Sequence, residues 1–176
     1  MNNLFDFKSA FHANISAWDT SSVTTMAMMF RGVTAFNVDI SGWNVSLVTD
    51  MQEMFNSASA FNANISAWDT SSVTTMRYMF SEATAFNADI TSWDTSSATN
   101  LKWMFSYASA WGESYTRVDS TSSTDGPPSA WKSMELPSPP PCDTSTAPTN
   151  GGVGTCTNSL GSGSTCQPTC NAGYTV

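Results

Sequence analysis

Hydrophobic positions recur along the first 110 residues with a period of 25. Four units align without a gap, at 11–35, 36–60, 61–85 and 86–110, and residues 1–10 match the last ten positions of a unit. Each unit opens on Phe, continues with Ile and Trp, and ends with Met, Met-Phe and a small residue. Because the array starts in mid-repeat, we expect the sequence to be a fragment of a longer protein.

Two different spacings divide each unit. In the second half, Met26, Met29, Phe30 and Val33 follow the i, i+3, i+4, i+7 spacing that lies on one face of a helix. In the first half, the apolar residues at 40–45 follow an L-x-x-L-x-L spacing, in which alternate residues of a short strand point inward. The pattern therefore predicts one short strand and one helix per unit.

A single unit cannot bury these faces, whereas stacking lets each apolar residue pack on its copies above and below. We therefore predict an α/β solenoid over 1–116, with Trp111 in the place of a fifth opening Phe and an irregular tail after it. The predicted core ladders are Phe11, Phe36, Phe61 and Phe86; Ile15, Ile40, Ile65 and Ile90; Trp18, Trp43, Trp68 and Trp93; Met26, Met51, Met76 and Leu101; Met29, Met54, Met79 and Met104; Phe30, Phe55, Phe80 and Phe105; Val33, Ala58, Ala83 and Ala108.

The recurring string F-N-x-D-I-S-x-W-D-T-S-x-V-T-x-M-x-x-M-F resembles the short repeats of the BspA-like leucine-rich surface proteins, including the 25-residue repeat domain of unknown function in mycoplasma surface lipoproteins. The resemblance covers residues 1 to about 116. It implies a right-handed leucine-rich-repeat-like coil, exposure on the cell surface, and a role in adhesion or in contact with host or matrix. It supplies no catalytic site. The usual Val of the strand is Thr20, Thr70 and Thr95 in three units, and only Val45 keeps it.

The chain after the repeats changes in composition. Residues 117–141 are rich in Ser, Thr and Pro, which predicts a semi-extended linker. As an alternative to a fully extended linker, Trp131, Met134 and Leu136 could form a short element that docks on the last coil. Residues 142–176 suggest a small, incomplete extracellular module, with Cys142, Cys156, Cys166 and Cys170 as disulfide candidates. A zinc site is the weaker alternative, because paired Cys-x-x-Cys groups and a nearby His are missing from the sequence.

Charge and candidate chemistry narrow the function. The net charge of -8 and six scattered basic residues argue against nucleic acid and anionic membranes as partners. The sequence contains neither a signal peptide nor the ~20-residue apolar run that membrane insertion needs. His12, the only histidine, stands where the other units have Asn, so we interpret it as a turn residue. The serines have no base to activate them, and we therefore expect no enzyme activity and no cofactor or metal.

Two rows of carboxylates and amides are the candidate binding groups. Asp19, Asn44, Asp69 and Asp94, beside Ser21, Ser46, Ser71 and Ser96, are expected to face outward on the concave surface and to bind an extracellular protein or glycan. The second row comprises Asn14, Asp39, Asn64 and Asp89. We expect it to stabilise turns, with calcium binding as the alternative. The alternative function is a structural spacer or coat component without a specific ligand.

Overall fold

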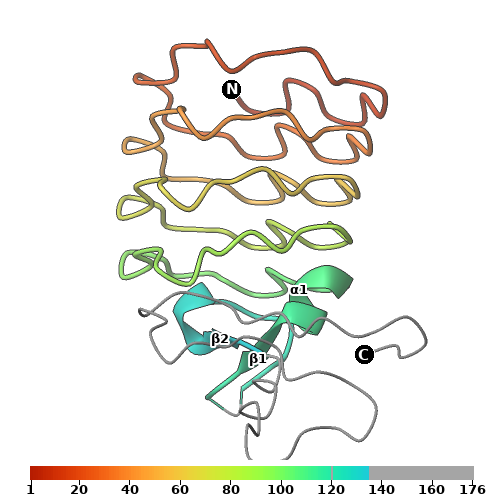
Figure 1. The fold of residues 1–176 in the computed structure, drawn as a ribbon. Helices are drawn as coiled ribbons and strands as arrows, with labels where there is room; N and C mark the ends of the chain where they lie inside the picture. Colours follow the sequence, from red (N-terminus) through yellow and green to blue (C-terminus); the bar gives the residue numbers. More distant parts are fainter. Residues whose placement is uncertain (120, 135–176) are drawn as a thin grey trace, which may run out of the picture. The chain divides into compact units, whose positions relative to one another are not determined.

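The computed structural model describes residues 1–119 and 121–134, which belong to a compact unit that spans Met1–Met134. Each 25-residue unit forms one coil, and successive coils lie directly on one another (Figure 1). We call this arrangement of residues 1–114 the coil stack. The right-handed, leucine-rich-repeat-like class of the predicted solenoid stays a prediction. Residues 135–141, Leu136 among them, the Cys-rich module and its four cysteines lie outside the described residues.

The coils contain turns rather than the predicted helices and strands. In the described part of the chain, the regular elements are α1 (Ser109–Ser114), β1 (Tyr115–Arg117), the 3-10 helix η1 (Pro128–Ala130) and β2 (Trp131–Ser133), all after the fourth unit's Ala108. Neighbouring coils are joined by isolated parallel bridges, Thr25↔Asp50, Asp50↔Thr75 and Thr75↔Asn100. The expectation of one strand and one helix per unit is therefore wrong.

The backbone conformation explains why no helix forms over 26–33. Met28 and Gly32 have φ of 55° and 67°, and equivalent residues in the other coils are left-handed too. A left-handed residue reverses the rotation of a right-handed helix, so the turn cannot propagate. The Met28 N–H donates to the Gln52 carbonyl of the next coil at 2.9 Å, while the Met29 N–H donates to Met26 within its own turn at 3.2 Å. Every second N–H thus bonds between coils instead of along a helix.

The predicted apolar ladders do form the core. Of their members, Trp18 is exposed, Phe11 and Leu101 are half-buried, and all others are buried. The rings stack from coil to coil, as Phe55 and Phe80 do with centroids 5.8 Å apart. The buried positions were therefore predicted correctly, although the predicted helix and strand of each unit were wrong.

Polar groups inside the stack find partners in adjacent coils. The indole N–H of Trp43 donates to the Ile15 carbonyl of the preceding coil at 3.1 Å, and Trp68 and Trp93 repeat this bond. The buried Thr70 hydroxyl donates to the Asp94 carbonyl of the next coil at 2.8 Å, and Thr20 makes the same bond to Asn44. Because these bonds compensate the burial of the polar atoms, Thr is tolerated where the repeat usually has Val.

Residues 115–119 and 121–134 cover the end of the coil stack, and we call them the cap. β1 and β2 pair antiparallel, with Thr116 opposite Lys132. Trp131 is 5% exposed and packs in T-shaped geometry with the rings of Phe105 and Trp111. Residues 117–119 and 121–134, assigned to the linker from the sequence, thus pack on the last coil, because its aromatic surface would otherwise remain in water. This agrees with the docking alternative for Trp131, whereas the Met134 side chain is exposed.

Candidate binding surfaces

The structure brings the eight predicted binding residues together in one row of turns. The four Asx side chains are exposed and occupy equivalent positions in successive coils. The Oδ1 atoms of Asp19, Asn44, Asp69 and Asp94 accept the backbone N–H of Ser21, Ser46, Ser71 and Ser96 at 3.0, 3.1, 3.1 and 2.9 Å. We call these eight residues the row face. Each pair forms an Asx turn, so the row face both shapes the backbone and presents oxygen atoms to solvent.

The same bonds set the ionisation of the row face. Hydrogen bonds from the side chain and the backbone N–H of Ser71 hold the pKa of Asp69 below its ordinary value, and nearby Asp94 opposes this shift. Hydrogen bonds from Ser21 and Ser96 lower the pKa values of Asp19 and Asp94. Donors that favour the carboxylate keep it ionised at neutral pH. The row face therefore offers fixed negative charge and hydrogen-bond acceptors.

The second row forms a matching line of Asx turns. The Oδ1 atoms of Asn14, Asp39, Asn64 and Asp89 accept the N–H of the residue two positions later at 3.0, 2.9, 3.0 and 3.0 Å. The structural role predicted for this row is therefore confirmed. Residues 1–119 and 121–134 bring together no group of three or more His, Cys, Asp or Glu side chains suited to a metal ion. His12 is exposed at its turn, with Nδ1 2.7 Å from the Ala10 carbonyl oxygen.

An aromatic cluster on the outer surface was missed from the sequence. Tyr78 and Trp103 stack with centroids 5.0 Å apart, and the Arg77 guanidinium lies 4.7 and 5.1 Å from the two ring centroids. Both aromatic residues are left-handed positions of their coils. The predicted helix face contained only Met26, Met29, Phe30, Val33 and their equivalents, so the sequence analysis did not consider these two aromatic residues.

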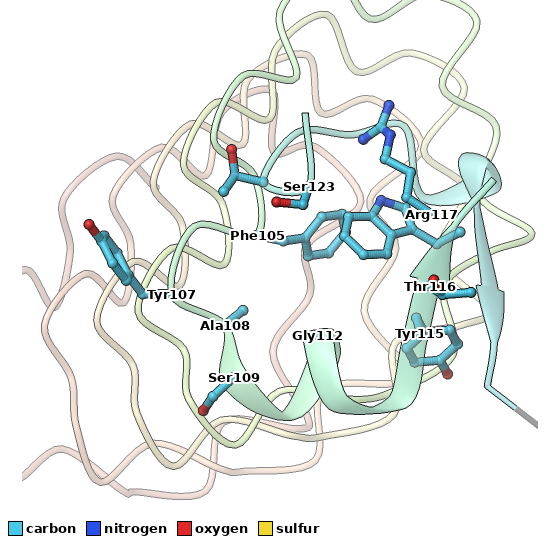
Figure 2. Close-up of a pocket in the computed structure, with 11 residues that line it drawn as sticks. Phe105, Tyr107, Ala108, Ser109, Gly112, Tyr115, Thr116, Arg117 and Ser123 are labelled. Atoms are coloured by element: carbon cyan, nitrogen blue, oxygen red, sulfur yellow. The ribbon is translucent and has the colours of Figure 1, made fainter. Parts of the chain in front are cut away.

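A pocket of about 420 Å³ lies at the end of the coil stack, between the last coil, α1 and the cap (Figure 2). The sequence did not predict this pocket, because most of the cap was assigned to the linker. Its lining residues are Phe105, Tyr107, Ala108, Ser109, Gly112, Tyr115, Thr116, Arg117, Ser123, Thr124 and Trp131. The volume is in the range of small-molecule sites.

Across the two described ranges, no helix is long and apolar enough to cross a membrane.

Comparison with known proteins identifies one related family. The family described as "Mycoplasma protein of unknown function, DUF285" matches residues 1–66 and 39–126. The two matches overlap and together span 126 of the 176 residues, including all four coils and the first part of the cap. Comparisons with curated proteins and with solved structures found no match.

Proposed function

The chain belongs to the Mycoplasma protein family of unknown function DUF285, and on this premise we propose that it is a non-catalytic recognition protein of the cell surface. In this proposal, an extracellular protein or glycan binds to the row face. The resemblance to surface repeat proteins supports the location, and the histidine held in a turn supports the absence of catalysis. Protease treatment of intact cells should then remove the protein, and full protection would contradict the surface location.

The observation that carries the proposal is the repetition of the same exposed acceptors in every coil. Asp69 Oδ1 is held by two donors of Ser71, the N–H at 3.1 Å and the hydroxyl at 2.7 Å. A side chain already held by its own turn loses little conformational freedom when a ligand binds. The row face is therefore a preorganised surface for a ligand rich in hydrogen-bond donors, such as a polyhydroxylated or cationic chain.

A structural spacer is the second candidate, and one observation favours it. The Oδ1 atom of every Asx residue in the row is already used inside a turn, as in the second row. A side chain that only shapes the backbone needs no ligand to explain it. The spacer and recognition hypotheses therefore differ in whether the charge of the row face affects binding.

Asn44 shows how to test this difference without disturbing the fold. Its Oδ1 accepts the Ser46 N–H at 3.1 Å, so Asn makes the same turn that Asp makes in the other coils. The triple variant Asp19→Asn/Asp69→Asn/Asp94→Asn should stay folded, with a small loss of stability like that of a second-row Asp→Asn change, and should bind a matrix-protein or polysaccharide panel about tenfold more weakly. Asp39→Asn/Asp89→Asn is the matched control in the second row and should bind like the wild type. A folded wild type that binds nothing would support the spacer, and a triple variant that binds as well as a binding wild type would exclude the row face as the binding surface.

A further inference from the structure

A backbone N–H that earlier coils donate to the next coil belongs, in the last coil, to a residue that lines the pocket. Gly32, Ser57 and Glu82 each donate this N–H to a carbonyl of the next coil at 2.7 Å. Tyr107 is the equivalent residue of the fourth unit, with φ of 57°, and it lines the pocket. Among the described residues no carbonyl takes the place of the next coil's acceptor for the Tyr107 N–H.

The cap replaces the next coil only in part. It supplies the Thr124 carbonyl to the Phe105 N–H at 2.9 Å and the Asp125 Oδ1 to the Trp103 N–H at 2.6 Å. These two N–H groups precede Tyr107 in the same alternating series. The described residues of the cap therefore provide one acceptor fewer than a coil does, and Tyr107 stands at the edge of the pocket (Figure 2). A ligand that carries a carbonyl oxygen would complete the series.

The charged group of the pocket is already satisfied. The Arg117 side chain is 8% exposed, and its guanidinium pairs with Asp119 and donates to the carbonyls of Asp125 and Gly126. This pairing lowers the pKa of Asp119 to about 2. Since the guanidinium is paired and mostly buried, the pocket has no free cation with which to attract an anionic ligand. Its chemistry favours a neutral one.

The remaining walls combine apolar rings with hydroxyl groups. Phe105 and Trp131 supply aromatic rings to the lining. The ring of Tyr107 projects away from Phe105 and is 79% exposed (Figure 2). Thr116 and Ser123 are exposed at the wall, and their hydroxyls form no hydrogen bond within residues 1–119 and 121–134. The pocket thus combines one backbone N–H donor, a small apolar surface and two hydroxyl groups. These groups are complementary to a polyhydroxylated ring that carries an acetamido group, with its carbonyl oxygen and methyl.

We propose that this pocket binds an N-acetylhexosamine unit of a glycan, as a site separate from the row face. The acetamido oxygen accepts the Tyr107 N–H, the acetyl methyl lies against Phe105 and Trp131, and the ring hydroxyls meet Thr116 and Ser123. An extended peptide is a poorer fit, because a strand that pairs with the last coil needs the N–H groups of Trp103, Phe105 and Tyr107. The cap already accepts the first two, so only the Tyr107 N–H is left for a peptide.

The first test uses ¹⁵N-labelled full-length protein and two sugars that differ at one carbon. N-acetylglucosamine should shift the Tyr107 amide resonance with an apparent Kd in the low millimolar range, as expected for a single sugar unit at about -4 kcal/mol. Glucose has a hydroxyl in place of the acetamido group and should bind at least ~10-fold more weakly. An unmoved Tyr107 resonance, or an equal response to both sugars, would overturn the proposal. A response to N-acetylglycine methylamide but not to the sugar would also overturn it, in favour of a peptide ligand.

The second test fills the pocket without disturbing the fold. Gly112 lies on α1 and lines the pocket, and a Cβ added there meets no atom within 4 Å. Gly112→Leu should therefore fold normally, aided by the better helix propensity of Leu, and weaken sugar binding at least ~10-fold. Gly42→Leu is the matched control, because Gly42 also has open space around it but lies in a distant coil.

Sugar binding by Gly112→Leu at wild-type strength would place the sugar elsewhere and refute the pocket. The row-face variant Asp19→Asn/Asp69→Asn/Asp94→Asn should still bind N-acetylglucosamine like the wild type. Loss of sugar binding in that variant alone would show that the sugar occupies the row face, so the two proposals fail separately.

Discussion

The tryptophan ladder makes a quantitative prediction about stability. Trp68 is 4% exposed, stacks on Trp93 at 6.2 Å and donates its indole N–H to the Ile40 carbonyl at 3.2 Å. Replacing a buried Trp with Ala costs about 3–5 kcal/mol, and the abandoned Ile40 carbonyl adds about 1 kcal/mol. We therefore expect Trp68→Ala to lower the free energy of unfolding by about 4–6 kcal/mol.

Trp18 is the matched control because it occupies the same position of its coil but is 37% exposed. It keeps ring contacts to Phe5 at 5.9 Å and to Trp43 at 6.4 Å. With more than a third of the side chain already in water, Trp18→Ala should cost only about 2 kcal/mol. Trp111, although it lies at the end of the coil stack, is not a suitable control, since it is fully buried between the last coil and the cap.

Urea unfolding of the three proteins, followed by the fluorescence of the remaining tryptophans, measures these differences from the transition midpoints at a common m-value. Trp68→Phe should fall between wild type and Trp68→Ala, because it keeps a stacking ring but loses the indole donor. Equal losses at Trp18 and Trp68 would refute the reasoning, because they would show that stability does not follow burial in the ladder.

Two further predictions concern the turns. Gly32→Val should lower the free energy of unfolding by about 2 kcal/mol, because φ is 67° there and the added Cβ would lie 2.5 Å from the Phe7 ring. Gly42→Val, the control, should have little effect, because a Cβ there meets no atom within 4 Å. Equal melting temperatures for the two variants would contradict this prediction. Hydrogen bonds from the backbone N–H and side chain of Ser41 lower the pKa of Asp39, and those from Thr91 lower the pKa of Asp89. The two carboxylates therefore stabilise the fold at a pH above the pKa of an unfolded Asp, about 3.9, and this stabilisation is lost as the pH falls below that value. Urea midpoints measured from neutral to acidic pH should decline in that acid range, and less steeply for Asp39→Asn/Asp89→Asn; identical slopes would contradict the assignment.

The sequence alone was sufficient to identify the repeat and its inward positions. A ladder residue must face its copies in every coil, so the period of 25 and the apolar spacing determine which side chains are buried, as Met29, Phe30 and Ile40 illustrate. The Asx turns of the second row were also predictable, because an Asx side chain bonds the backbone two residues later within its own segment. These features depend on neighbours in the sequence or on exact copies of them.

Tertiary structure decided the backbone conformation and the end of the stack. The spacing of Met26, Met29, Phe30 and Val33 suits a helix face, but it suits a series of turns equally well, and the choice depends on where alternate N–H groups find acceptors. Those acceptors belong to the next coil, 24 residues away for Met28 and Gln52, so local propensity could not reveal them. The pocket is similar, because Tyr107 faces it only where the cap stops short of replacing a coil. Burial thus follows from periodicity within the chain, whereas hydrogen-bond partners and surfaces follow from which segments meet in space.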